Sequence, residues 1–281
     1  MKRLACKKHC RYLKLGSRES SRAFNRIRRY EHLGDMSVWG KVLGGAAGFA
    51  LGGPLGALIG AVAGHAVDKM RADERVRTGE PGDATKGIAF TIGVIVLGAK
   101  MAKADGKVTQ DEVAAFKEVF QVPPAEIKNV GRLFNQARKD AAGFEPYAQQ
   151  IGRMFRDHPA VLEELLDGLF HIARADGQVT DGELSYLERI AQIFGFTAAD
   201  WDRIRAGNMG PDAADPFEIL GVARDAEDTA IKAVYRKLVR ENHPDRLIAQ
   251  GMPAEFVQLA NDKLATINTA YDRIRELRGL K

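Results

Sequence analysis

The sequence predicts an all-α protein with three parts: a glycine-rich apolar helix, a duplicated helix–turn–helix bundle and a C-terminal helical hairpin. Three patterns lead to this prediction. An uncharged run at 42–67 has a glycine at every fourth position, one short motif occurs twice, and apolar residues recur at helical spacing after residue 228. With 281 residues and 45% hydrophobic side chains, the chain can form about two domains.

The positive charge is concentrated at the N-terminus. The chain has 42 Lys and Arg against 37 Asp and Glu, and eleven of the basic residues fall within residues 1–35. Residues 36–281 are therefore nearly neutral, so the overall charge gives no reason to expect a nucleic-acid partner. Cys6 and Cys10 are the only cysteines. A disulfide framework and a zinc site with several thiolates are thus excluded for the rest of the chain, which fits a reducing compartment.

Residues 1–35 are predicted to be a basic arm, and Met36 is the expected native start. The uncharged run 42–67 that follows is long enough to cross a bilayer. Glycines at a period of four share one stripe of a helix and allow a second helix to approach closely in lipid. We therefore predict a membrane segment at 36–70, which forms a homodimer through a glycine zipper made of Gly44, Gly48, Gly52, Gly56, Gly60 and Gly64.

Two other interpretations of this segment stay open. It could be a flexible segment, or a helical hairpin broken at Gly52-Gly53-Pro54, because proline and glycine both disfavour a helix interior. The basic residues after the run (Lys69, Arg71, Arg75 and Arg77) favour a cytoplasmic C-terminal side. The expected location is a bacterial-type inner membrane with the domains facing the cytoplasm, and the alternative is a soluble cytoplasmic protein. Residues 71–86 have turn chemistry and are expected to form a linker.

Residues 87–205 contain an internal repeat. The segment 104–112 (ADGKVTQDE) returns as 175–183 (ADGQVTDGE). Each copy lies between an apolar helix, expected at 90–102 and 161–173, and an amphipathic one, expected at 112–120 and 183–194. Two such units packed against each other would form one α-helical domain. Phe194, Phe196 and Trp201 are expected in its core or between its helices.

The repeated turn has two interpretations. Its Asp, Gly and Glu match the second half of a calcium loop, but Met101, Lys103, Ile172 and Arg174 stand where two further oxygen ligands are needed. We instead expect a capping box in which Thr109 or Thr180 begins the next helix with Glu112 or Glu183. The pattern resembles the TerB-like (tellurite-resistance type) helical domain. That resemblance offers Asp105, Glu112, Asp176 and Glu183 as metal candidates, although we predict no bound metal and no cofactor.

After a linker at 206–214, residues 215–281 predict a short helix, a second helix ending near Asn242 and capped by Asp225 or Asp228, and a final helix starting near Pro253. Basic side chains of the second helix fall on one face or beside it (Lys232, Arg236, Lys237 and Arg240). His243-Pro244-Asp245 follows, where proline marks a turn. The apolar residues expected to pack the last helix on the second are Phe256, Leu259, Leu264, Ile267, Ala270, Tyr271 and Ile274.

This segment resembles the J domain along its whole length. Four elements occur in order: Phe217 to Val222, Tyr235 to Leu238, His243 to Asp245, and Ile267 to Tyr271. The resemblance implies that His243, Pro244 and Asp245, with the basic residues Lys232, Arg236, Lys237 and Arg240, bind a DnaK-type ATPase chaperone. The chain has no phosphate loop or catalytic triad pattern, so it is expected to activate a partner ATPase rather than act as an enzyme.

The order of parts over residues 36–281 resembles the DjlA-type membrane-anchored co-chaperones. The resemblance implies a co-chaperone that stimulates ATP hydrolysis through its His-Pro-Asp loop and directs the chaperone through its TerB-like domain to a client that the sequence does not name. Two alternatives stay open: a stress- or metal-responsive TerB-like binding protein, and a soluble J-domain adaptor. The chain lacks the Gly/Phe-rich linker and the Cys-x-x-Cys repeats of full-length DnaJ, so general substrate holding is not expected.

Overall fold

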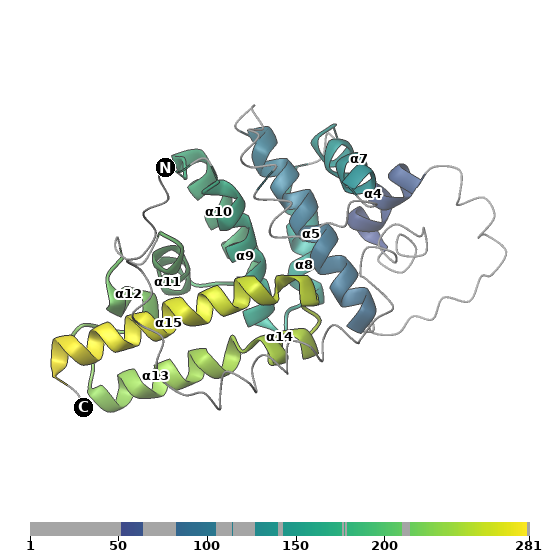
Figure 1. The fold of residues 1–281 in the computed structure, drawn as a ribbon. Helices are drawn as coiled ribbons and strands as arrows, with labels where there is room; N and C mark the ends of the chain where they lie inside the picture. Colours follow the sequence, from purple (N-terminus) through teal and green to yellow (C-terminus); the bar gives the residue numbers. More distant parts are fainter. Residues whose placement is uncertain are drawn as a thin grey trace, which may run out of the picture. The chain divides into compact units, whose positions relative to one another are not determined.

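The computed structural model describes residues 52–63, 83–104, 114, 127–139, 143–175, 177, 179–209 and 214–279. Across these residues the regular elements are all helices (Figure 1), so the all-α prediction is confirmed. The basic arm and several residues singled out from the sequence lie outside the described residues, namely Gly44, Gly48, Gly64, Asp105, Thr109, Glu112 and Asp176.

The central bundle is formed by helices α5 and α7 to α11. Their bounds are α5 (Asp83–Ala104), α7 (Ile127–Lys139), α8 (Glu145–Met154), α9 (Pro159–Ala173), α10 (Asp181–Phe194) and α11 (Ala198–Asn208). Helix α5 packs against α7, α8, α9 and α10, and its residues from Gly87 to Ala102 are buried. This helix begins inside the predicted linker 71–86, and α11 extends into the predicted linker 206–214.

Among the described residues, α5 is the helix that is long and apolar enough to cross a membrane, over Thr85–Ala102. However, 89% of that stretch is buried inside the protein. The core helix expected from the apolar run Phe90–Ala102 is therefore confirmed, and it is longer than the run suggested. Its burial against the surrounding helices supplies the apolar contacts that stabilise the bundle.

The second copy of the repeat folds as predicted. Thr180 is the N-cap of α10, its hydroxyl accepts from the Glu183 backbone N–H at 3.2 Å, and the Glu183 carboxylate accepts from the Thr180 backbone N–H at 2.8 Å. This capping box pairs backbone donors that a helix start leaves unsatisfied. Trp201 is buried against Phe170 at 5.7 Å between ring centroids, and Phe194 and Phe196 pack on the same core, as expected.

Part of the glycine-rich segment is described as helix α4 (Gly53–Ala63), which packs on α7 and α8. Gly52 and Gly53 have φ of 54° and 56°, and Pro54 stands in the first turn. Since a left-handed backbone cannot continue a right-handed helix, α4 has its start here. The buried Gln150 side chain holds this start: Leu55 N–H donates to its Oε1 at 3.0 Å, and its Nε2 donates to the Gly52 carbonyl at 3.0 Å.

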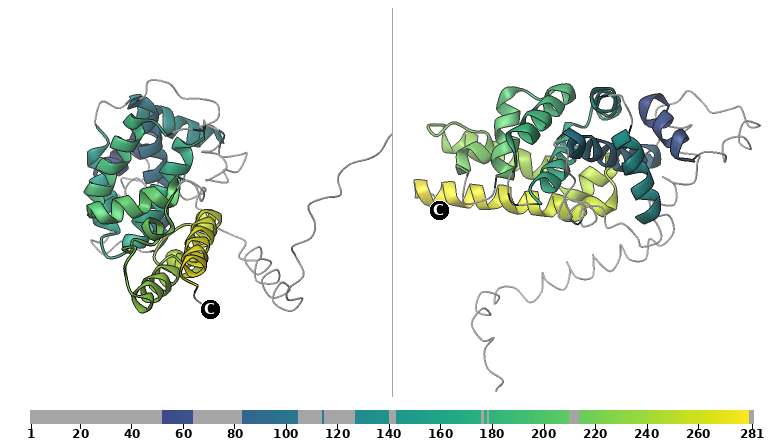
Figure 2. Two further views of the ribbon diagram at one scale, coloured as in Figure 1. Left: turned by 90° about the vertical axis from the view of Figure 1, so that its left-hand side faces the viewer. Right: turned by 90° about the horizontal axis from the view of Figure 1, so that it is seen from above.

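The C-terminal hairpin consists of α12 (Pro216–Leu220), α13 (Asp228–Glu241), α14 (Pro244–Ala249), a 3-10 turn (Ala254–Phe256) and α15 (Val257–Arg278). Helices α13 and α15 lie side by side (Figure 2), and α12 packs on α15. The hairpin has its own apolar core around Phe217, Ile231, Leu238, Ile267 and Ile274. Arg278 ties the ends of the hairpin together by donating to Asp228 Oδ1 at 2.6 Å and to the Ala226 carbonyl.

Two expectations about this hairpin were wrong, and one was confirmed. Helix α13 begins after Glu227, which makes no side-chain cap, so neither Asp225 nor Asp228 is the N-cap. The last helical stretch begins near Pro253 as expected, with a 3-10 turn at 254–256 that leads directly into α15 at Val257. Phe256 and Leu259 pack on the central bundle instead of on α13. The apolar pattern identified buried positions but could not say which core would bury them.

Candidate functional site

The His-Pro-Asp loop caps a short helix. His243 is the N-cap of α14, and its Nδ1 accepts a hydrogen bond from the Asp245 backbone N–H at 3.2 Å. The proton of a neutral imidazole is then on Nε2. Pro244 occupies the first helical position, where its fixed φ and missing N–H are tolerated. The side chains of His243 and Asp245 are 51% and 55% exposed, whereas Pro244 is buried.

A surface groove adjoins this loop. Its volume is about 430 Å³, and it is lined by Tyr235, Arg236, Val239, Arg240, His243, Asp245 and Arg246. The structure thus brings Arg236 and Arg240 together with the loop. Lys232 and Lys237 are exposed on the same helix but do not line the groove. Arg246 was not among the predicted site residues, although its place directly after the motif could have indicated it.

Aromatic and amide side chains fix the helix that carries these arginines. The rings of Tyr235 on α13 and Tyr271 on α15 stack with centroids 3.9 Å apart, and Tyr235 Oη donates to Asn268 Oδ1 at 3.0 Å. Stacked aromatic pairs are worth about 0.5–1.5 kcal/mol beyond their buried area. Tyr235 therefore serves two purposes, since it joins the helices and lines the groove.

The groove is suited to binding rather than to reaction chemistry. An exposed carboxylate at Asp245 can form charge-assisted hydrogen bonds with a basic group of a partner. The guanidinium groups of Arg236, Arg240 and Arg246 around it offer positive charge to an acidic surface. Over the described ranges there is no group of three His, Cys, Asp or Glu side chains arranged to hold a metal ion. Glu183, the metal candidate that the structure describes, is buried in the capping box of α10.

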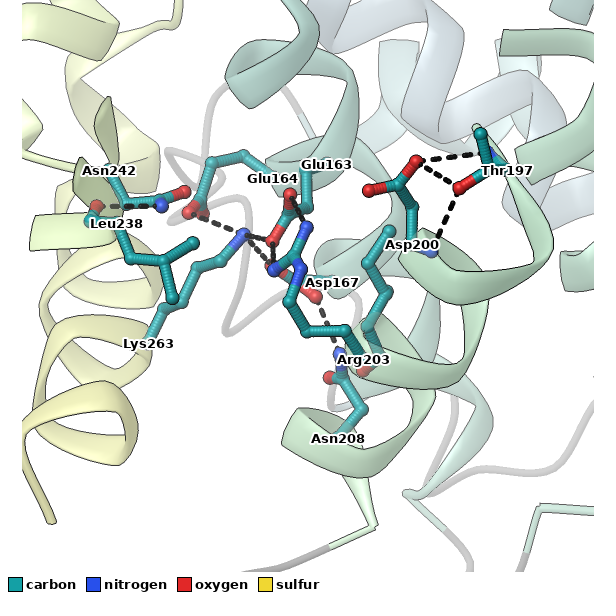
Figure 3. A network of polar contacts seen from close by, with 11 residues as sticks. Glu163, Glu164, Asp167, Thr197, Asp200, Arg203, Asn208, Leu238, Asn242 and Lys263 are labelled. Atoms are coloured by element: carbon teal, nitrogen blue, oxygen red, sulfur yellow. Dashed lines mark hydrogen bonds and ion pairs between the residues drawn. The ribbon is translucent and has the colours of Figure 1, made fainter. Parts of the chain in front are cut away.

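A second cluster of charged residues lies buried where α9 and α11 meet α15 (Figure 3). Glu163, Glu164 and Asp167 of α9 are at most 5% exposed. Arg203 of α11 forms a bidentate pair with Glu163, at 2.8 and 2.6 Å. Lys263 of α15 brings its Nζ to 2.6 Å from Glu163 and 2.7 Å from Asp167. We call these five residues the ion cluster.

Burial and neighbouring charges set opposite protonation states within the ion cluster. Burial alone would raise the pKa of Glu163, but the positive charges of Lys263 and Arg203 outweigh it and hold that pKa well below the usual range. Glu164 is also buried. Its Oε1 lies 3.5 Å from Lys263 Nζ, farther than the carboxylate oxygens of Glu163 and Asp167. Burial, aided by the charges of Asp167 and Glu163 and opposed by Lys263, raises the pKa of Glu164 to about 8. Glu164 is therefore mostly protonated at neutral pH.

Replacing Glu164 by glutamine is expected to change how stability depends on pH. The folded-state pKa of Glu164 is raised from 4.5 to about 8, so the folded protein binds the proton more tightly than the unfolded chain does. Stability is then lost as pH rises through this window, by up to ~1.4 kcal/mol per pH unit. E164Q should match the parent below pH 4.5 and exceed it in free energy of unfolding near pH 8. Urea unfolding at several pH values across this range measures the difference. If the free energies of unfolding of the two proteins differ by the same amount at every pH, the raised pKa of Glu164 is contradicted.

Comparison with protein families accounts for most of the chain. The Co-chaperone DjlA transmembrane domain matches residues 36–78, Tellurite resistance protein TerB matches residues 91–206, and the DnaJ domain matches residues 215–276. The co-chaperone protein DjlA of Photobacterium profundum is 30% identical over 278 residues, covering 87% of this chain and 100% of that protein. The DjlA of Shewanella oneidensis is 30% identical over 264 residues, covering 88% of this chain and 100% of that protein.

The chain belongs to the DjlA co-chaperone family. No solved structure gives a significant match to it. Membership of the DjlA family makes it a membrane-associated J-domain co-chaperone, a regulator rather than an enzyme. The groove lies wholly within the DnaJ-domain match, whereas the ion cluster joins that match to the TerB match through Lys263.

Proposed function

We propose that this DjlA-family chain stimulates ATP hydrolysis by a DnaK-type chaperone through its His-Pro-Asp loop. The observation that carries this proposal is the groove, in which the exposed carboxylate of Asp245 stands beside Arg236 and Arg240. The carboxylate would pair with a basic group of the chaperone, while the arginines and the exposed Lys232 and Lys237 would steer an acidic surface toward the loop. The TerB-like domain would select the client on which the chaperone acts.

The energetic basis of this role is pre-organisation. In the described loop, Pro244 restricts the backbone and the His243 cap fixes the amide of Asp245, so little conformational entropy remains to be lost when a partner binds. A small charged loop held rigidly in solvent favours specific and fast association, even where the interface buries little area. The hydrolytic chemistry would remain with the chaperone.

A steady-state ATPase assay tests the proposal. Purified DnaK-type chaperone from a bacterial source is incubated with ATP and increasing amounts of the full chain in detergent. We expect ATP turnover to rise and saturate as the chain is added. Turnover that stays at the basal rate at every chain concentration would contradict the proposal.

We further propose that residues 42–67 anchor the chain in the bacterial inner membrane, that the domains face the cytoplasm, and that the glycines form a homodimer contact. Gly52, Gly56 and Gly60 are the members of the proposed zipper within the described residues, and Gly52 lies before α4, which begins at Gly53. Helix α4 packs on the bundle through Leu55 and Leu58, an arrangement that would also suit the soluble-adaptor alternative. The experiment that separates the two is membrane extraction.

After alkaline carbonate extraction of cell membranes, the full chain is expected to stay in the membrane pellet, because an inserted helix is held by apolar burial that high pH does not weaken. A variant in which Leu55 and Leu58 are both replaced by aspartate should move to the supernatant. Release of the parent chain by carbonate would favour the soluble adaptor, in which α4 simply covers the bundle.

A further inference from the structure

The His-Pro-Asp loop is followed directly by residues that are buried in the central bundle rather than in the core of the hairpin. Leu247, three positions after Pro244, is 0% exposed and belongs to the apolar core built by α5, α8 and α9. Met252 and Phe256 join the same core, and the Phe256 ring packs edge-on against Phe90 of α5 at 4.7 Å. The backbone between them also lies close to α5, because a Cβ on Gly251 would come within 2.7 Å of Lys86 Cβ.

Helix α14 needs this support. It has six residues, and a helix so short is unstable in water without packing. The Leu247 side chain of α14 packs in the bundle core, which is distinct from the hairpin core around Ile231 and Ile267. The first two residues of α14 are Pro244 and Asp245 of the loop itself. The packing of Leu247 therefore bears directly on the position of the Asp245 carboxylate.

The ion cluster fixes the same junction from the other side. Lys263, two turns into α15, reaches between Glu163 and Asp167 and is itself largely shielded from solvent, with 12% of its side chain exposed. Burial lowers the pKa of Lys263, but the charges of Asp167 and Glu163 outweigh this effect and raise it, so the residue stays charged. Asn242, directly before the loop, is 2% exposed, and Figure 3 shows its side chain pointing toward the ion cluster.

We propose that the TerB-like domain is a platform that orders the His-Pro-Asp loop, with Leu247 and Lys263 as the positioning residues that join the two. The platform leaves His243 and Asp245 exposed, so it presents the loop instead of covering it. The proposal rests on the proposed function of the loop and extends it: the two domains act as one rigid body, and the direction from which the chaperone approaches is set by α5 and α9. A J domain on a free tether would lack this fixed direction.

Amide hydrogen exchange of the full chain in detergent tests the platform without any chaperone. The amides that report on α14 are those of Arg246, Leu247, Gln250 and Met252, each bonded to a carbonyl within residues 243–248. In Leu247→Ala we expect these amides to exchange at least about tenfold faster than in the parent, because the helix loses its apolar anchor. Leu133→Ala is the matched control: Leu133 lies in the same core but on α7, which packs against α5 and α4.

The control should leave exchange at residues 246–252 within twofold of the parent. If Leu133→Ala accelerates these amides as much as Leu247→Ala does, or if neither variant affects them, the platform is refuted. Lys263→Met provides a second route should Leu247→Ala fail to fold, and the same amides are expected to exchange faster in it.

In the ATPase assay, the chain concentration for half-maximal stimulation should rise several-fold for Leu247→Ala and not for Leu133→Ala. If the amides exchange equally fast in Leu247→Ala and the parent while the parent chain still stimulates the ATPase, the platform is refuted and the proposed function is not.

Discussion

Replacing Asp245 by asparagine is expected to abolish stimulation of a DnaK-type ATPase. The change keeps the size of the side chain and removes its negative charge, so a charge-assisted hydrogen bond to the chaperone becomes a weak neutral one. Because the Asp245 backbone N–H donates to His243 Nδ1 and asparagine keeps that N–H, the cap of α14 should be retained. Basal turnover at saturating D245N, with an unchanged circular dichroism spectrum, is the expected result.

Arg236→Glu is the matched variant from the same groove. Arg236 is exposed and lies on α13 beside the loop, so reversing its charge should weaken association with an acidic surface without removing the carboxylate. We expect a higher chain concentration at half-maximal stimulation and little change in the maximum. Full stimulation by D245N would show that the carboxylate is not the activating group, even if R236E behaved as expected.

Replacing Lys263 by methionine is expected to produce the largest loss of stability of any single charge removal in the hairpin. The change leaves the carboxylates of Glu163 and Asp167 buried, with Arg203 still paired to the former. Breaking a buried ion pair on one side typically costs about 3–5 kcal/mol, because the remaining charge is uncompensated. Urea unfolding followed by circular dichroism measures the free energy of unfolding. Lys237→Met, an exposed lysine on α13, should stay within about 0.5 kcal/mol of the parent.

A double variant separates the charge effect from simple packing loss. In Lys263→Met with Asp167→Asn, one buried negative charge is removed together with the lysine, so part of the lost stability should return. The coupling between the two sites is read from a double-mutant cycle. If K263M costs less than about 1 kcal/mol, or if the two changes are additive, the ion cluster does not hold the domains together.

Much of the hairpin could be predicted from sequence because its signals are local. The helical spacing of Ile231 and Leu238, the basic residues one turn apart and the proline after His243 each depend on neighbours within a few residues, and local signals do not need the fold. The same holds for the capping box of Thr180 and Glu183, which is complete within four positions. The groove beside the loop was not predicted from the sequence, although Arg236, Arg240, His243 and Asp245, four of the residues that line it, were among the predicted site residues.

The ion cluster had no comparable signal. Glu163, Glu164 and Asp167 interrupt an apolar helix, and a run of acids on a helix is normally read as its solvent-facing side. Their partner Lys263 is about a hundred positions away on α15, so only the packing of α15 on α9 shows that these charges are buried and paired. For the same reason, the apolar character of Phe256 and Leu259 was evident from the sequence, but their packing partners in the central bundle were not.

The sequence by itself determined the helical class, the tandem order of the parts, the repeated turn and the residues of the His-Pro-Asp loop, since each is encoded in spacing along the chain. The tertiary structure decided which parts contact each other. It placed Leu247 in the core of the TerB-like domain and Lys263 among its carboxylates, and it started α4 at Gly53. Contacts between segments far apart in sequence depend on which surfaces bury each other, and that choice is made only when the whole chain packs.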